Sequence, residues 1–182
     1  MRFEPTALPG VIKIVPTVYE DSRGFFMETW QSRLFRDAGI DVNFVQDNFS
    51  QSSKGTLRGL HYQIEQPQGK LVRVVQGEVF DVAVDLRRSS PQFGQWVGGI
   101  LSAENKNQLW VPPGFGHGFL VLSDTAEFEY KCTDYYAPEF ERSIRWDDPE
   151  IGIDWPLQDG VPPVLSDKDA AAPLFKDADT YP

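Results

Sequence analysis

The sequence predicts an all-β fold, an antiparallel jelly-roll barrel with a few short peripheral helices. The 15 glycines and 14 prolines are scattered as turn residues between short apolar runs, and aromatic residues make up 13% of the chain. The connections between the runs are too short for parallel crossovers, which need about a dozen or more residues. Neighbouring strands are therefore expected to be antiparallel.

The first third of the chain is predicted to contain an edge strand, an aromatic strand and one helix. Residues 11–19 alternate β-branched and polar side chains, but they include Pro16, which cannot donate to a sheet ladder, so they are expected at a sheet edge. Residues 21–30 read as a turn followed by an aromatic strand. Apolar residues at helical spacing, ended by a glycine, predict a helix over residues 31–39. Residues 44–52 are predicted to form a strand.

The central part of the chain predicts seven further strands at short, regular spacing. Pleating puts Lys70 on the same face as Val72 and Val74. In a later strand, Tyr130 shares a face with Phe128 and is expected to point inward. The predicted strands cover residues 56–64, 70–76, 78–86, 95–102, 106–111, 117–123 and 125–132.

The predicted strand over residues 78–86 carries two carboxylates on one face. Asp81 and Asp85 lie opposite an apolar face that is made of Phe80, Val82, Val84 and Leu86. Two interpretations are open. Either the carboxylates lie on a solvated outer surface, or Asp81 or Asp85 orients a histidine inside the barrel.

The length of 182 residues fits one domain, 1–182. After residue 133 the strand pattern weakens. Residues from about 157 to 182 are expected to form a tail that packs on the barrel, with a short helix that begins at Lys168 or Asp169.

The charge and cysteine content exclude several classes of protein. The 27 acidic and 17 basic residues give a net charge of −10, which repels nucleic acid and anionic membranes, so an anionic ligand requires a local basic cluster. Cys132 is the only cysteine, which excludes an intrachain disulfide. No apolar run approaches the roughly 20 residues of a membrane span, and no signal peptide pattern is present. A soluble, cytoplasmic protein is expected.

The two histidines are the first candidates for proton chemistry. His61 lies in LRGLHYQ, residues 57–63, beside Arg58, and His117 lies in WVPPGFGHGFLVL, residues 110–122. Each is expected at the mouth of a strand. Histidine changes its charge near neutral pH and can act as a general base, although a hydrogen-bonded packing role is the alternative for both.

The second histidine motif resembles that of the cupin barrel, because Pro112, Gly114 and His117 have P-x-G-x-x-H spacing. Metal-binding cupins also carry H-x-H and a following glutamate in their first motif. Here Tyr62 and Gln63 follow the first histidine instead. Since the chain has only two histidines, a histidine-rich metal site cannot form, and neither a metal nor another cofactor is expected.

The remaining chemical groups permit epimerisation. A neutral imidazole such as His61 can remove a proton from a carbon next to a carbonyl group, and Lys70 can stabilise the enolate oxygen. Tyr130, on the opposite side, can return a proton. Removal from one face and return to the other inverts the carbon.

A resemblance to a known family is carried by four motifs, in order: LRGLHYQ, QGKLVRVVQGEVFDVAVDLR, SPQFGQWVGGILSAENKNQLWVPPGFGHGFLVLS and LSDKDAAAP. Together they resemble the dTDP-4-dehydrorhamnose 3,5-epimerase family, from about residue 2 to about residue 175. The resemblance implies a cofactor-free cupin enzyme of dTDP-L-rhamnose biosynthesis. It would convert dTDP-4-keto-6-deoxy-D-glucose into dTDP-4-keto-L-rhamnose by inverting C3 and C5.

The resemblance also implies roles for individual residues. His61 would be the general base, paired with Asp169, although the nearby Asp167 is an alternative partner. Tyr130 would be the proton donor, and Lys70 would face the developing enolate. Tyr136 would stack on thymine, and the enzyme would be a homodimer. The residues implied to contact the dTDP-sugar are Arg23, Glu28, Gln46, Asp47, Asn48, Arg58, His117, Tyr136, Glu141 and Lys168.

Strict alternation would put Arg58 and His61 on opposite faces of their strand, yet both are needed in one pocket. A bulge or kink is therefore predicted at Gly59. Other functions stay open at this point. They are a dTDP-sugar epimerase that inverts one carbon, a 3,4-ketoisomerase, a non-catalytic nucleotide-sugar-binding cupin and a metal-dependent cupin dioxygenase.

Overall fold

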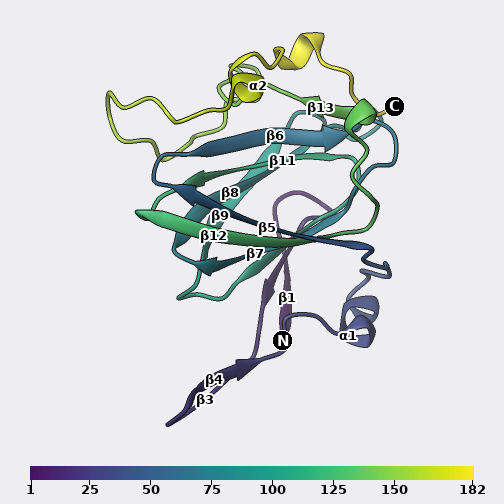
Figure 1. The fold of residues 1–182 in the computed structure, drawn as a ribbon. Helices are drawn as coiled ribbons and strands as arrows, with labels where there is room; N and C mark the ends of the chain where they lie inside the picture. The colour runs from purple at the N-terminus through teal and green to yellow at the C-terminus, as the bar shows by residue number, and fades with distance from the viewer.

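The computed structural model describes residues 1–182, in which two antiparallel sheets face each other as a jelly-roll barrel with a few short helices outside it (Figure 1). This confirms the predicted all-β class. One sheet contains, in spatial order, β1 (Arg2–Pro5), β2 (Ile12–Val15), β10 (Gln108–Val111), β7 (Lys70–Gln76), β12 (Thr125–Cys132) and β5 (Gln46–Ser53). The other contains β13 (Glu141–Ser143), β6 (Leu57–Gln63), β11 (Phe115–Val121), β8 (Glu78–Asp85) and β9 (Trp96–Ser102).

The remaining elements lie outside these sheets. They are the hairpin β3 (Val18–Asp21) and β4 (Gly24–Met27), the helices α1 (Ser32–Asp37) and α2 (Asp167–Ala170), and the 3₁₀ turns η1 (Pro138–Phe140) and η2 (Phe175–Asp177). Helix α1 falls within the predicted residues 31–39. None of these helices has the length and apolarity needed to cross a membrane.

The prediction that residues 11–19 form an edge strand was wrong. Strand β2 pairs with β10 on one side and with β1 on the other, so the unpredicted β1 forms the edge of the sheet. Pro16 follows the last residue of β2, where its missing N–H removes no ladder bond. Beyond it, β3 and β4 form an arm that projects away from the barrel (Figure 1).

The expectation that each histidine lies at a strand mouth was also wrong. Gly114 completes a turn with φ of 94°, so β11 begins at Phe115 rather than at residue 117. His117 and His61 are direct cross-strand partners on β11 and β6. The two imidazoles are therefore carried by neighbouring strands of one sheet. Similarly, β10 begins at Gln108 rather than at residue 106, because Lys106 has a left-handed φ of 57°.

Strand β8 has its apolar face turned outward and its carboxylates turned inward. Val82, Val84 and Leu86 pack against the chain after residue 143, including Trp155 and Phe175, on the outer side of the five-stranded sheet. Asp81 is fully buried on the barrel side. The C-terminal segment thus covers a face that would otherwise be exposed, and the strand needs no solvated side.

Candidate active site

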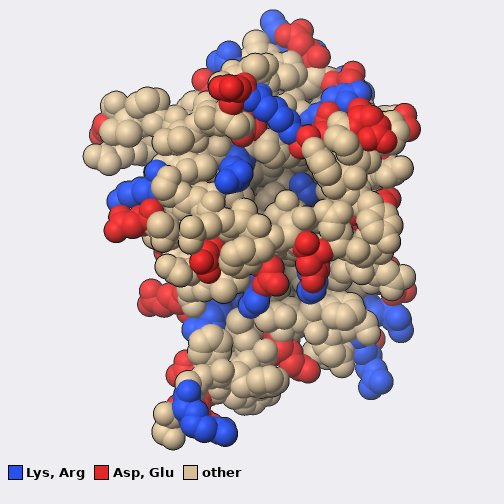
Figure 2. All heavy atoms as spheres, in the orientation of Figure 1, with Lys and Arg blue, Asp and Glu red and all other residues tan.

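A cavity of about 140 Å³ lies inside the barrel. The two histidines come from β6 and β11 of one sheet, whereas Lys70 and Tyr130 come from β7 and β12 of the other. On the face shown in Figure 2, the molecule is hollowed between β6 and β12, and basic side chains border the hollow. The nine residues that line the cavity are Ser50, Arg58, His61, Lys70, His117, Gly118, Phe119, Phe128 and Tyr130.

A bulge at Gly59 brings Arg58 and His61 to the same cavity, as the sequence predicted. His117 pairs with His61 and Phe119 pairs with Arg58, so β6 uses one residue more than β11 over this stretch. Gly59 has φ of 121°, and a Cβ atom there would lie 2.6 Å from Cα of Gly118. Only glycine fits this backbone and this close approach of the two strands.

His61 is paired with Asp169, which α2 brings to the barrel. Nε2 of His61 lies 2.5 Å from Oδ1 of Asp169, and the hydroxyl of Ser166 donates to Oδ2 at 2.8 Å. Burial is the largest single influence on the pKa of Asp169 and would raise it, but the interactions with His61, Ser166 and Lys168 together outweigh burial and leave the pKa below its ordinary value. Asp167 is exposed at the start of the same helix. The structure therefore places Asp169 against the imidazole.

His117 is held by Asp81, one of the two carboxylates that the sequence proposed as a histidine partner. Nε2 of His117 lies 2.9 Å and 3.0 Å from the two Asp81 oxygens, and both side chains are buried. Burial raises the pKa of Asp81, and the nearby His117 and Lys70 oppose that rise. Asp85 instead accepts hydrogen bonds from Arg87 and Ser90 in the turn after β8.

Lys70 and Tyr130 present unpaired polar groups to the cavity. Lys70 Nζ lies 5.9 Å from the centroid of the Tyr130 ring and makes no ion pair within the chain, and the Tyr130 hydroxyl makes no hydrogen bond. Burial lowers the pKa of Lys70 and raises the pKa of Tyr130. The ammonium can therefore lose its proton more readily than an exposed lysine, while the phenol keeps its proton.

Five of the predicted ligand-binding residues are connected by hydrogen bonds and an ion pair, and together they are called the rim. They are Gln46, Asn48, Tyr136, Glu141 and Lys168. Tyr136 donates its backbone N–H to Gln46 Oε1 at 2.9 Å and its hydroxyl to Glu141 Oε2 at 2.8 Å. Gln46 donates to Asn48, and Lys168 forms an ion pair with Glu141. Burial would raise the pKa of Glu141, but the hydrogen bonds from Lys168 and Tyr136 keep it below its ordinary value.

Arg58 supplies a positive charge to the cavity in a fixed orientation. Its Nε donates to the buried hydroxyl of Ser52 at 3.0 Å, and its two terminal nitrogens make no hydrogen bond within the chain. A guanidinium held in this way can bind a phosphate with both terminal nitrogens.

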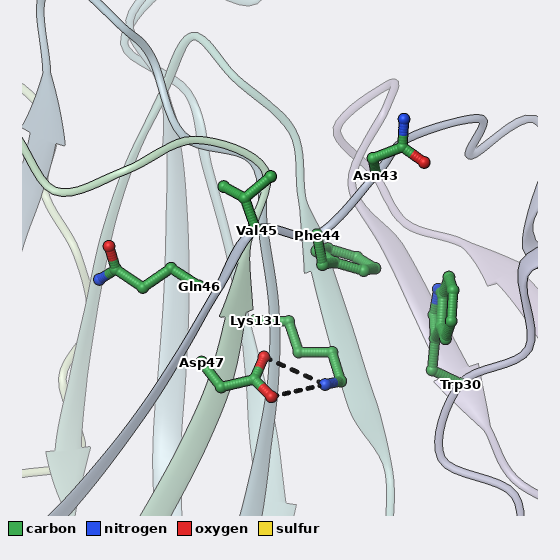
Figure 3. Close-up of a pocket in the computed structure, with 7 residues that line it drawn as sticks. All are labelled: Trp30, Asn43, Phe44, Val45, Gln46, Asp47 and Lys131. Carbon is green, nitrogen blue, oxygen red and sulfur yellow. Dashed lines mark hydrogen bonds and ion pairs between the residues drawn. The ribbon is translucent and has the colours of Figure 1, made fainter.

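Three predicted ligand-binding residues do not reach the cavity of their own chain. Arg23 is paired with Asp21 on the projecting arm, and Glu28 is exposed at its base. Asp47 points to the outer side of β5, where it binds Lys131 beside a hollow of about 390 Å³ that Trp30 and Phe44 also line (Figure 3). Gln46 points away from that ion pair, as alternation along a strand requires (Figure 3).

The sequence reasoning missed the polar residues of β5 that follow Asn48. Ser50 lines the cavity and Ser52 holds Arg58. The signal that could have found them is the period of two, because Asn48, Ser50 and Ser52 share one face of the strand. Within residues 1–182, no group of three or more His, Cys, Asp and Glu side chains is arranged to hold a metal ion.

Comparisons with known proteins agree with this geometry. The sequence model of the dTDP-4-dehydrorhamnose 3,5-epimerase family matches residues 5–177. A dTDP-4-dehydrorhamnose 3,5-epimerase of Pseudomonas aeruginosa is 61% identical over 183 residues, which cover 100% of both chains.

Solved structures show the same fold. A Legionella pneumophila dTDP-6-deoxy-D-glucose-3,5-epimerase in complex with dTDP-4-keto-L-rhamnose superposes with a TM-score of 0.94 at 57% identity, covering 98% of this chain and 94% of that chain. A 3′-monoepimerase of Streptomyces bikiniensis in complex with dTDP-quinovose has a TM-score of 0.88 at 38% identity, covering 94% of this chain and 87% of that chain.

Proposed function

The chain belongs to the dTDP-4-dehydrorhamnose 3,5-epimerase family, a family of isomerases, and from this premise we propose that its barrel cavity inverts C3 and C5 of dTDP-4-keto-6-deoxy-D-glucose. The product is dTDP-4-keto-L-rhamnose, an intermediate of dTDP-L-rhamnose biosynthesis. The observation that carries the proposal is the arrangement of His61, Lys70 and Tyr130 around one cavity, with the base and the proton donor on opposite sheets.

His61 removes the proton from carbon. Because Asp169 accepts a hydrogen bond from Nε2–H, the lone pair of the imidazole lies on Nδ1, which makes no hydrogen bond within the chain. The C–H bond next to the C4 carbonyl breaks, its electron pair forms a C=C bond to C4, and the carbonyl becomes an enolate. Asp169 stabilises the imidazolium that results.

Lys70 stabilises the enolate and Tyr130 completes the inversion. The ammonium of Lys70 interacts strongly with the enolate oxygen because the cavity excludes most of the water that would screen it. Tyr130 then donates its hydroxyl proton to the other face of the carbon, where the electron pair of the C=C bond forms the new C–H bond and the C4 carbonyl re-forms. Water removes the proton from His61 and restores that of Tyr130 before the second carbon reacts.

The rim and Arg58 bind the nucleotide part of the substrate. Arg58 offsets the charge of the diphosphate, which a protein of net charge −10 would otherwise repel. The exposed ring of Tyr136 offers a stacking surface for thymine. His117, Gln46, Asn48, Glu141 and Lys168 are the further polar contacts of the substrate.

The functional unit is a homodimer of single-domain chains in the cytoplasm. The arm of β3 and β4 exposes Tyr19, Phe25 and Phe26, an aromatic surface that its own barrel leaves largely uncovered. Packing of the arm against a second copy would bury these rings and carry Arg23 and Glu28 to the partner's cavity. The buried, free thiol of Cys132 is consistent with a reducing compartment.

The test is incubation with the 4-keto sugar in D₂O. Deuterium at both C3 and C5 of the product, detected by NMR, is the expected result. The variant His61→Ala should lose about 10²- to 10⁴-fold in kcat while it retains dTDP binding. Absence of label, or full activity of His61→Ala, would refute the proposal.

A second candidate is inversion at one carbon only. The similarity to the Streptomyces bikiniensis 3′-monoepimerase favours this alternative, since that protein shares the barrel at 38% identity. The same experiment separates the two functions, because a monoepimerase would introduce deuterium at a single position.

A further inference from the structure

Gln63 is a buried polar side chain with no role in the chemistry described so far. It lies at the end of β6, two residues after His61, and only 3% of it is exposed. Its Nε2 donates to the carbonyl oxygens of Gln66 at 2.7 Å and Tyr135 at 3.2 Å, and its Oε1 accepts from the N–H of Ala137 at 2.9 Å. Because two partners are carbonyl groups and the third is an N–H group, they fix the orientation of the amide.

Two of the three partners of Gln63, Tyr135 and Ala137, flank Tyr136 on both sides. The N–H of Tyr136 itself donates to Gln46 Oε1 at 2.9 Å. The side chains of Gln63 and Gln46 therefore form hydrogen bonds with the backbone of three consecutive residues, 135–137, although this segment belongs to no strand. In contrast, Tyr136 as a whole residue is 53% exposed. The residue has a fixed backbone and an open aromatic face.

We propose that Gln63 is a positioning residue that sets the place of the Tyr136 ring relative to His61. This inference rests on the proposed function, in which Tyr136 stacks on thymine. Strand β6 carries His61, and the amide of Gln63, the last residue of the same strand, binds the backbone on both sides of Tyr136. This attachment fixes the distance between thymine and the imidazole of His61, and therefore the position of the sugar carbons. The position matters because small misplacements at a reacting centre cost much of the rate.

The test replaces Gln63 by Met, which keeps the approximate shape but removes all three hydrogen bonds, and by Glu, which keeps the acceptor but removes the donor. The Kd for dTDP and the KM for the 4-keto sugar are expected to rise about tenfold in both variants. The Kd for pyrophosphate, which is bound through Arg58, should not change. Gln76→Glu is the matched control, because Gln76 is exposed and its side chain makes no hydrogen bond.

A double-mutant cycle separates positioning from general loss of structure. In a Tyr136→Ala background, Gln63→Met should have no further effect on dTDP affinity, since the Tyr136 ring is already gone. Unchanged dTDP affinity in Gln63→Met, an equal loss of pyrophosphate affinity, or additive effects with Tyr136→Ala would each overturn the inference. Failure of the parent protein to label its substrate in D₂O would instead refute the proposed epimerase function, so the two outcomes are distinct.

Discussion

The imidazole of His61 and the carboxylate of Asp169, which are 108 residues apart in the chain, lie 2.5 Å apart beside the barrel cavity. The pair joins β6 to the short helix α2 of the C-terminal segment. Ser166 fixes both the helix and the carboxylate, since its hydroxyl donates to Asp169 Oδ2 and accepts from the Asp169 N–H. The hydrogen bond that orients the His61 imidazole thus depends on how the C-terminal segment is docked.

The variant Asp169→Asn should lower kcat about 10- to 100-fold, because an amide cannot stabilise the imidazolium as a carboxylate does. Steady-state kinetics with the 4-keto sugar measure the effect. Asp167→Asn is the control, since Asp167 lies exposed on the same helix and should retain full activity. An equal loss of activity in the two variants would contradict the assignment of Asp169 as the partner.

Loss of the Lys70 proton should make the reaction rate fall as the pH rises into the alkaline range. Burial lowers its pKa from the ordinary 10.5, so its positive charge is lost at a lower pH than that of an exposed lysine. Tyr130 does not produce this fall, because burial raises its pKa. The pH profile of kcat/KM, which reports groups of the free enzyme, should therefore fall on the alkaline side, and Lys70→Arg, whose charge persists, should be slower but lack the fall. A fall that survives in Lys70→Arg would assign it to another group.

Lys70 should also make stability depend on pH in a defined direction. Its pKa is lower in the folded than in the unfolded chain, so between these two pKa values the unfolded chain binds more protons, and stability rises with pH. Below the folded-state pKa both states are protonated, and the contribution no longer changes. Urea unfolding across this window should show a steeper rise for the parent protein than for Lys70→Met. Identical slopes would mean that Lys70 is not buried in the native state.

The bulge at Gly59 should tolerate no side chain. Gly59→Ala combines a φ of 121° with a Cβ atom only 2.6 Å from Gly118, and it should destabilise the fold by about 1–3 kcal/mol or more. It should also lower activity, since it moves Arg58 relative to His61. Gly99→Ala on β9 is the control, because nothing lies within 4 Å of its Cβ position and it should change stability by less than about 0.5 kcal/mol. Similar urea midpoints for the two variants would show that the bulge is not constrained.

Hybrid dimers test whether the arm serves the partner's cavity. Arg23→Ala and His61→Ala should each reduce activity, and Arg23→Ala should do so through a higher KM. If arms cross between subunits, co-refolding the two variants restores one intact cavity in each hybrid, and activity returns. If each arm serves its own barrel, no cavity is intact and activity stays low.

The sequence alone determined the all-β class and most strand positions. Alternation of side chains and turn residues are local properties, so β7 and β12 were predicted with the bounds that the structure shows. Strands β1 and β13, of four and three residues, were missed because pairing partners define them rather than an apolar pattern of their own. The bulge at Gly59 was predictable, since a missing side chain was the one local feature that allows Arg58 and His61 to share a face.

Other features of the site were decided only by tertiary structure. Asp167 and Asp169 are two residues apart and equally acidic in sequence, and the docking of the C-terminal segment selects Asp169 as the partner of His61. The inward direction of Asp81 likewise depends on residues beyond 143, which cover the apolar face of β8. The physical reason is common to both cases. The sequence shows which side chains share a face of a strand or helix. Only packing against residues far along the chain decides which of the two faces becomes the interior.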